Sequence, residues 1–155
     1  MKTVFFPGSF NPFTKGHADI VERMLRLSDK VVIGIGYNAR KEGIENDTNI
    51  NLDQIRKLYS EAPYNGRVSV IAYTGLSAEK AIELKADCMV RSVRNAADFE
   101  YEASLAEANR KTFGIETIII PCDPALSYIS STLVRELRTF GREDLARELL
   151  PGSQE

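Results

Sequence analysis

The sequence has little that would cross-link the chain or place it in a membrane. It contains two cysteines among 155 residues, each within an apolar run. No apolar stretch approaches the roughly 20 residues that a membrane-spanning helix needs. We therefore expect Cys88 and Cys122 to be buried, reduced thiols, which are typical of a cytoplasmic protein. The apolar run near the N-terminus breaks at Pro7, which is too early for a secretory signal and favours a strand.

An excess of positive charge is absent as well. The chain has 20 Lys and Arg against 22 Asp and Glu, a net charge of −2. Proteins that bind nucleic acid by neutralising phosphates usually carry a basic excess, so a nucleic-acid partner is not expected, whereas a small anion in a local cationic pocket is compatible. With 43% hydrophobic and 27% charged residues, the composition excludes intrinsic disorder, collagen and coiled coil. We expect one domain over residues 1–155.

Short runs rich in β-branched residues alternate with segments of helical periodicity. The sequence predicts strands over residues 3–6, 30–37, 68–73, 87–90 and 116–121. Nearly continuous apolar strands separated by helices predict a parallel sheet with helices on both faces. The fold class is therefore α/β, a single-domain, Rossmann-like, doubly wound, five-stranded parallel sheet.

The expected helices are placed by apolar spacing and by capping residues. In the first, apolar side chains recur at residues 20, 21, 24 and 25. A capping box starts the second at Asn51, and Ser77 is expected to cap the third, with Ile82 on its apolar face. The fourth runs over residues 98–111, the fifth starts at Ser130 or Ser131, and the last covers residues 144–149. Ligands of such folds bind at the carboxyl ends of the strands, here residues 7–16, 38–50, 74–77, 91–97 and 122–130.

Residues 34–39 (Gly-Ile-Gly-Tyr-Asn-Ala) match the dinucleotide fingerprint G-x-G-x-x-A. That motif needs its glycines at a turn that opens a helix, since the pyrophosphate lies on the helix N-terminus. Here both glycines fall inside a strand and a polar, turn-prone segment follows. We expect that Gly34 and Gly36 relieve crowding against a neighbouring backbone.

The loop after the first strand carries the strongest sign of a ligand site. Two prolines and two glycines constrain residues 7–17, and the histidine at their end, His17, is the only one in the chain. It falls in the first turn of a helix at the carboxyl edge of the sheet, where free N–H groups suit a phosphate. From the residues alone, a surface histidine is an equally good interpretation.

Three motifs resemble a known enzyme superfamily. Residues 8–12 (Gly-Ser-Phe-Asn-Pro) and 14–17 (Thr-Lys-Gly-His) resemble the (T/H)-x-G-H signature of nucleotidyltransferases, and residues 129–132 (Ile-Ser-Ser-Thr) with Arg135 resemble the second signature. Residues 91–102 (Arg-Ser-Val-Arg-Asn-Ala-Ala-Asp-Phe-Glu-Tyr-Glu) are similar to a stretch of bacterial phosphopantetheine adenylyltransferases. The resemblance runs from residue 3 to about residue 140.

The resemblance implies reversible transfer of AMP from ATP to 4′-phosphopantetheine, giving dephospho-coenzyme A and pyrophosphate. The substrate's own phosphate is the nucleophile, so the site supplies positioning and relief of charge, with His17 stabilising the transition state. The substrate residues implied are Ser9, Lys41, Ser77 and Arg91. The ATP contacts implied are Ser9, Phe10, His17, Ser92, Val93, Arg94, Glu102, Leu126, Ser127, Tyr128, Ile129, Ser130, Ser131 and Thr132.

Several of these residues also have an ordinary structural interpretation. Taken alone, Lys41 fits a solvated lysine of a polar loop, Glu102 fits a partner for a cation on a helix, and the hydroxyls near Ser130 fit an N-cap. Three departures from the family pattern are Asn11 in place of Asp, Ser92 in place of Gly, and the lack of T-x-E-E-R in residues 49–55.

The resemblance also implies Mg²⁺ bound with ATP, with no protein ligand assigned, a homohexamer, and binding of coenzyme A as a feedback ligand. Rival interpretations are a transferase acting on nicotinamide mononucleotide or glycerol phosphate, and a nucleotide-binding regulatory module without catalysis. The motif at residues 98–102 (Asp-Phe-Glu-Tyr-Glu) favours phosphopantetheine.

Overall fold

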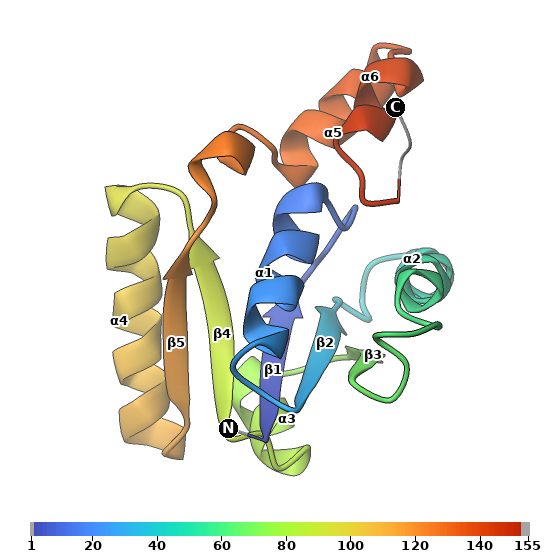
Figure 1. Cartoon of the computed structure of the whole chain (residues 1–155). Coiled ribbons are helices and arrows are strands. Elements are labelled where there is room, and N and C mark those ends of the chain that lie inside the picture. The colour runs from blue at the N-terminus through green and yellow to red at the C-terminus, as the bar shows by residue number, and fades with distance from the viewer. Residues whose placement is uncertain (1, 153–155) are drawn as a thin grey trace.

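The computed structural model describes residues 2–152, which form one five-stranded sheet with helices around it (Figure 1). The strands are β1 (Thr3–Gly8), β2 (Lys30–Gly36), β3 (Val68–Tyr73), β4 (Cys88–Val93) and β5 (Glu116–Pro121). The helices are α1 (Lys15–Leu25), α2 (Ile44–Leu58), α3 (Ser77–Glu83), α4 (Ala96–Phe113), α5 (Ser131–Thr139) and α6 (Glu143–Glu148), with a 3₁₀ turn at Pro124–Leu126.

The sheet is parallel throughout, in the order β3-β2-β1-β4-β5. Its central strands are buried on both faces, which is why they read as continuous apolar runs. On one face, the core combines Val4 and Ile33 with side chains of α1 and α2. On the other, Phe5 and Val32 pack with α3 and with residues at the end of α4. The prediction of a Rossmann-like α/β fold is confirmed. Within residues 2–152, no helix is long and apolar enough to cross a membrane.

The first helix agrees with its sequence pattern. Its buried residues are the four predicted apolar ones, at positions 20, 21, 24 and 25, and His17 lies in its first turn. Ser130 caps α5 by accepting a hydrogen bond from the Leu133 N–H, and Val134 is fully buried, also as expected.

The predicted start of the second helix is wrong. Helix α2 begins at Ile44, so Asn51 lies in its interior and does not cap it. The N-cap position belongs to Gly43, at φ 75°, which glycine adopts at little cost. A capping box identifies a local pattern that can also occur inside a longer helix. Half of the segment expected as a binding loop, residues 38–50, is therefore helical.

The third helix also begins differently from the prediction. Leu76 is the N-cap residue and Ser77 is the first residue of α3. The Ser77 hydroxyl is hydrogen bonded to the Tyr73 hydroxyl at 2.7 Å, so it does not cap the helix. Ile82, expected on the apolar face, is 47% exposed.

Two strand-level predictions need correction. β4 runs to Val93, so Arg91 and Ser92 lie within the strand and not in the following loop. They pair with Ile119 and Ile120 of β5.

Gly34 relieves crowding against aromatic rings, since a Cβ there would lie 2.4 Å from the Phe5 ring. The expectation of a neighbouring backbone was wrong.

Helices α5 and α6 form a small apolar cluster of their own above the carboxyl end of the sheet (Figure 1). Val134, Ala146 and Leu149 are buried within it. The Lys15 N–H donates to the Leu149 carbonyl at 2.9 Å, which joins this pair of helices to the start of α1.

Candidate active site

A pocket of about 500 Å³ opens at the carboxyl ends of β1 and β4. The strand order is β3-β2-β1-β4-β5, so β2 and β3 are added on one side of β1, and β4 and β5 on the other. The crevice between β1 and β4 is therefore the switch point of the sheet, where doubly wound folds bind their ligands. Eleven of the residues singled out from the sequence line the pocket: Ser9, His17, Arg91, Ser92, Arg94, Glu102, Leu126, Ile129, Ser130, Ser131 and Thr132.

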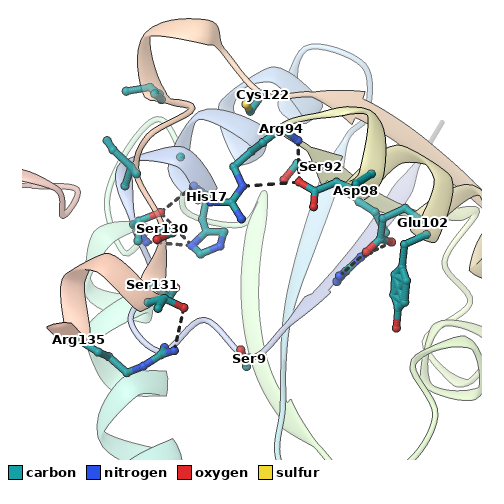
Figure 2. Close-up of a pocket in the computed structure, with 18 residues that line it drawn as sticks. Ser9, His17, Ser92, Arg94, Asp98, Glu102, Cys122, Ser130, Ser131 and Arg135 are labelled. Carbon is teal, nitrogen blue, oxygen red and sulfur yellow. Dashed lines mark hydrogen bonds and ion pairs between the residues drawn. The ribbon is translucent and has the colours of Figure 1, made fainter.

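The orientation of His17 is fixed by the cap of its own helix. Thr14 is the N-cap of α1, and its main-chain N–H donates to His17 Nδ1 at 3.0 Å. Because Nδ1 accepts a hydrogen bond, the proton of the neutral imidazole is on Nε2. Figure 2 shows the ring among the side chains that line the pocket, Arg94 and Ser130 included. His17 is thus arranged as a hydrogen-bond donor toward the pocket.

Three phenylalanines surround the same imidazole. The ring centroids of Phe10 and Phe13 lie 4.9 Å and 5.4 Å from that of His17, and Phe6 lies 6.3 Å away. Burial among these rings, together with the positive charges of Arg91 and Arg94, lowers the pKa of His17 from 6.5 to about 4. The imidazole is therefore neutral at pH 7.

The two pocket arginines are held in different ways. Arg91 donates from Nε and Nη2 to the two carboxylate oxygens of Glu102, both at 2.9 Å, and from Nη1 to the Pro7 carbonyl at 2.7 Å. This bidentate pair fixes the guanidinium plane. Arg94 has a looser partner, Asp98, with Nε 3.7 Å from Oδ2, and its side chain is 45% exposed. Arg91 is preset, whereas Arg94 can still reorient toward an anion.

The start of α5 brings hydroxyl groups to the opposite wall. Ser131 Oγ donates to the Pro12 carbonyl at 2.8 Å, and Thr132 Oγ1 accepts from Arg135 at 3.2 Å. Free main-chain N–H groups at a helix N-terminus favour an anion. The pocket is therefore bordered by a histidine donor, two arginines and a helix start.

Six residues named from the sequence do not line this pocket. Phe10 and Val93 are buried core residues, Tyr128 is 64% exposed, and Ser127 turns back to the Pro124 carbonyl. Lys41 is exposed and borders a separate hollow formed by residues 39–46 and 49. The sixth, Ser77, lies at the start of α3.

Comparisons with known proteins agree with this geometry. Residues 5–137 match the model of the cytidylyltransferase-like family. The chain is 44% identical over 138 residues to the phosphopantetheine adenylyltransferase of Porphyromonas gingivalis, covering 89% of this chain and 88% of that protein. It is 42% identical over 146 residues to that of Bacteroides thetaiotaomicron, covering 92% of each. The chain belongs to the phosphopantetheine adenylyltransferase family.

Solved structures support the fold of this family member at much lower identity. A bifunctional NMN adenylyltransferase/ADP-ribose pyrophosphatase from Francisella tularensis superposes with a TM-score of 0.63 at 18% identity, covering 90% of this chain and 42% of that one. A putative nicotinate-nucleotide adenylyltransferase from Vibrio parahaemolyticus gives 0.61 at 19%, covering 92% and 90%. The fold agrees with the family assignment made from the sequence relatives, and the protein is a nucleotidyltransferase of this family.

The donor groups of this nucleotidyltransferase do not fit a metal held by the protein. No group of three or more His, Cys, Asp or Glu side chains within residues 2–152 is placed to hold an ion. Both carboxylates of the pocket are engaged, Glu102 by Arg91 and Asp98 by Arg94.

Sequence reasoning left out seven lining residues: Thr14, Gly16, Ala97, Asp98, Tyr101, Cys122 and Arg135. All of them except Cys122 belong to the quoted motifs, so the motifs themselves were the available signal. Cys122 was expected to be a buried thiol, but it is half-buried at the pocket wall because it follows the last residue of β5. Cys88 is buried as predicted.

Proposed function

We propose that the protein transfers AMP reversibly from ATP to 4′-phosphopantetheine, giving dephospho-coenzyme A and pyrophosphate. The observation that carries this proposal is the convergence of His17, Arg91, Arg94 and the start of α5 on one pocket at the switch point of the sheet. In the reaction, an oxygen of the pantetheine phosphate attacks the α-phosphorus of ATP. A new P–O bond forms while the bond from the α-phosphorus to the bridging oxygen breaks, and pyrophosphate leaves.

Such an attack needs no protein base, because the phosphate nucleophile is already ionised at pH 7. The demand on the site is to align two anions and to stabilise the charge that builds up around the α-phosphorus. Neutral His17 suits that demand, since its Nδ1 is occupied by Thr14 and its Nε2–H can donate. We assign to His17 a hydrogen bond to an α-phosphate oxygen in the transition state.

The ATP side of the pocket is assigned to β4 and α5. Arg94 and the start of α5 suit the β- and γ-phosphates. The guanidinium, the hydroxyls and the free main-chain N–H groups of the first helical turn can all donate hydrogen bonds to phosphate oxygens. Leu126 and Ile129 suit the adenine as apolar walls. The contacts of ATP with Ser9, Phe10, Ser92, Val93, Ser127 and Tyr128 stay predictions.

The acceptor side is assigned to Arg91 and Ser9, which line the same pocket. Arg91 is held by Glu102, so the role that fits Glu102 in this arrangement is to orient the arginine, while its direct contact with ATP stays a prediction. Contacts of Lys41 with the acceptor phosphate and of Ser77 with the pantetheine arm also stay predictions.

Several wider properties belong to the same proposal. Mg²⁺ would arrive on the phosphates of ATP, since magnesium usually keeps several waters and leans on phosphate oxygens. A homohexamer is consistent with large apolar side chains left exposed on α4, Phe99 at 51% and Leu105 at 42%. Feedback binding of coenzyme A and a cytoplasmic location stay predictions.

The test is pyrophosphate release from Mg·ATP, with 4′-phosphopantetheine, nicotinamide mononucleotide and glycerol phosphate as separate acceptors. We expect release with phosphopantetheine alone, accompanied by dephospho-coenzyme A. Release with another acceptor would reassign the substrate, and ATP binding without release to any acceptor would contradict the proposed activity.

A further inference from the structure

Side chains of α2 and α5 donate hydrogen bonds to the loop between β1 and α1. Its carbonyls at Phe10 and the next two residues each accept a bond from a distant side chain. Asn51 Nδ2, from α2, donates to the Phe10 carbonyl at 2.6 Å. Arg135 and Ser131, from α5, donate to the following two carbonyls. The loop is thus fixed by two helices that lie 41 and about 120 residues further along the chain.

Phe10 needs such an anchor because its backbone is unusual. Its φ is 46°, in the left-handed region that residues with a Cβ rarely adopt. The local sequence does not favour this conformation, so contacts from elsewhere must hold it. Helix propensity does not explain an asparagine at position 51, because asparagine stabilises a helix interior less than alanine does. Its interaction with the Phe10 carbonyl gives a reason for its position.

The position of the Phe10 ring bears directly on His17. The two ring centroids are 4.9 Å apart at an interplanar angle of 90°. The Phe10 ring is also packed tightly against Gly8, since a Cβ on Gly8 would lie 2.9 Å from the ring. The Phe10 backbone also follows Ser9, which lines the pocket. A change in the Phe10 backbone would therefore shift one wall of the imidazole site and the Ser9 hydroxyl together.

We propose that Asn51 is a positioning residue, which holds the Phe10 backbone in its left-handed conformation and thereby keeps the His17 imidazole aimed into the pocket. Asn51 is not among the residues that line the pocket, and its contact with the site runs through the Phe10 carbonyl. The catalytic part of the inference rests on the proposed function, whereas the structural part concerns the imidazole alone. These two parts call for separate measurements.

The decisive variant is Asn51→Ala, with Gln54→Ala as its matched control. Both changes replace an amide side chain of α2 by alanine, and Gln54 is exposed. Alanine is the better helix former, so loss of helix propensity cannot explain a defect. We expect the Asn51 variant to lower kcat about tenfold with KM for ATP within twofold of wild type, because orientation of a transition-state donor is lost. The Gln54 variant should match wild type.

The readout that separates positioning from general damage is NMR of His17, whose signal is unambiguous because it is the only histidine. We expect the wild-type imidazole to remain neutral and protonated on Nε2 well below pH 6, and the Asn51→Ala titration midpoint to move toward 6.5. Asn51→Leu has a similar shape and removes the donor without adding a charge that would itself shift the His17 titration, so it replaces Asn51→Ala if the latter melts early. An unchanged kcat, or a lower kcat with an unchanged His17 titration, would overturn the proposal. The NMR measurement needs no substrate, so it decides on Asn51 even if wild type fails to release pyrophosphate.

Discussion

Two loops that follow neighbouring strands of one sheet are built in opposite ways. The loop after β1, residues 9–14, contains buried aromatic rings and carbonyls held by two distant helices. The loop after β2, residues 37–43, is polar and mostly exposed, and Lys41 lies outside the main pocket. The first is fixed before any ligand arrives, as stabilisation of a transition state requires. The second contains Lys41, for which a contact with the acceptor phosphate is proposed.

The largest effect on the difference between the two loops is expected from removing the His17 imidazole, which the loop after β1 surrounds. We expect His17→Ala to lower kcat at least ~10²-fold, because a donor that acts in the transition state is lost. KM for ATP should change little, and the melting temperature should stay within a few degrees of wild type. Initial rates of pyrophosphate release measure the effect. Near-normal turnover would remove His17 from the mechanism.

Burial of His17 should make the free energy of unfolding depend on pH. Its pKa is about 4 in the folded protein against 6.5 in the unfolded chain, so the unfolded chain binds more protons between these values. Stability from this group is therefore complete above pH 6.5 and is lost as pH falls toward 4. The loss by pH 4.5 should be about 2 to 3 kcal/mol.

Urea unfolding at pH 7 and pH 4.5 measures this loss, with His17→Gln as the reference for the carboxylates that titrate in the same range. The difference between the two pH values should be smaller in the variant by the stated amount. Equal differences in both proteins would show that the imidazole is not held neutral by its surroundings.

A milder change tests the preset arginine of β4. Glu102→Gln keeps the shape of the side chain but weakens its bidentate pair with Arg91. We expect KM for 4′-phosphopantetheine to rise about tenfold, because the guanidinium loses its fixed orientation. Glu100→Gln, an exposed change on the same helix, is the control. If KM for ATP rises instead, Glu102 belongs with the nucleotide.

The smallest effect is expected from the second loop. Lys41→Ala should raise KM for 4′-phosphopantetheine about fivefold and leave kcat and the NMR titration of His17 unchanged, because an exposed lysine contributes attraction without fixed geometry. Steady-state kinetics with varied acceptor measure it. An effect on the His17 signal would show that the two loops are coupled, and no change in KM would place Lys41 outside the site.

The sequence was a good guide where neighbouring residues decide the outcome. The apolar spacing of α1 located its buried face, and Ser130 identified the cap of α5, because both depend on residues within one or two turns. It was a poor guide at Asn51, whose local pattern resembles a cap. Its hydrogen-bond partner, the Phe10 carbonyl, lies 41 residues away and leaves no trace in the surrounding residues.

By itself, the sequence determined the alternation of strands and helices, the position of His17 in the first turn of a helix, and the motifs that point to nucleotidyltransferases. Those features rest on short-range spacing and on residue chemistry. The tertiary structure alone decided that Phe10 adopts a left-handed backbone, that Glu102 orients Arg91, and that Lys41 stands apart from the pocket. Each of these depends on which distant backbone and side-chain groups meet, and packing of the sheet and helices sets those meetings.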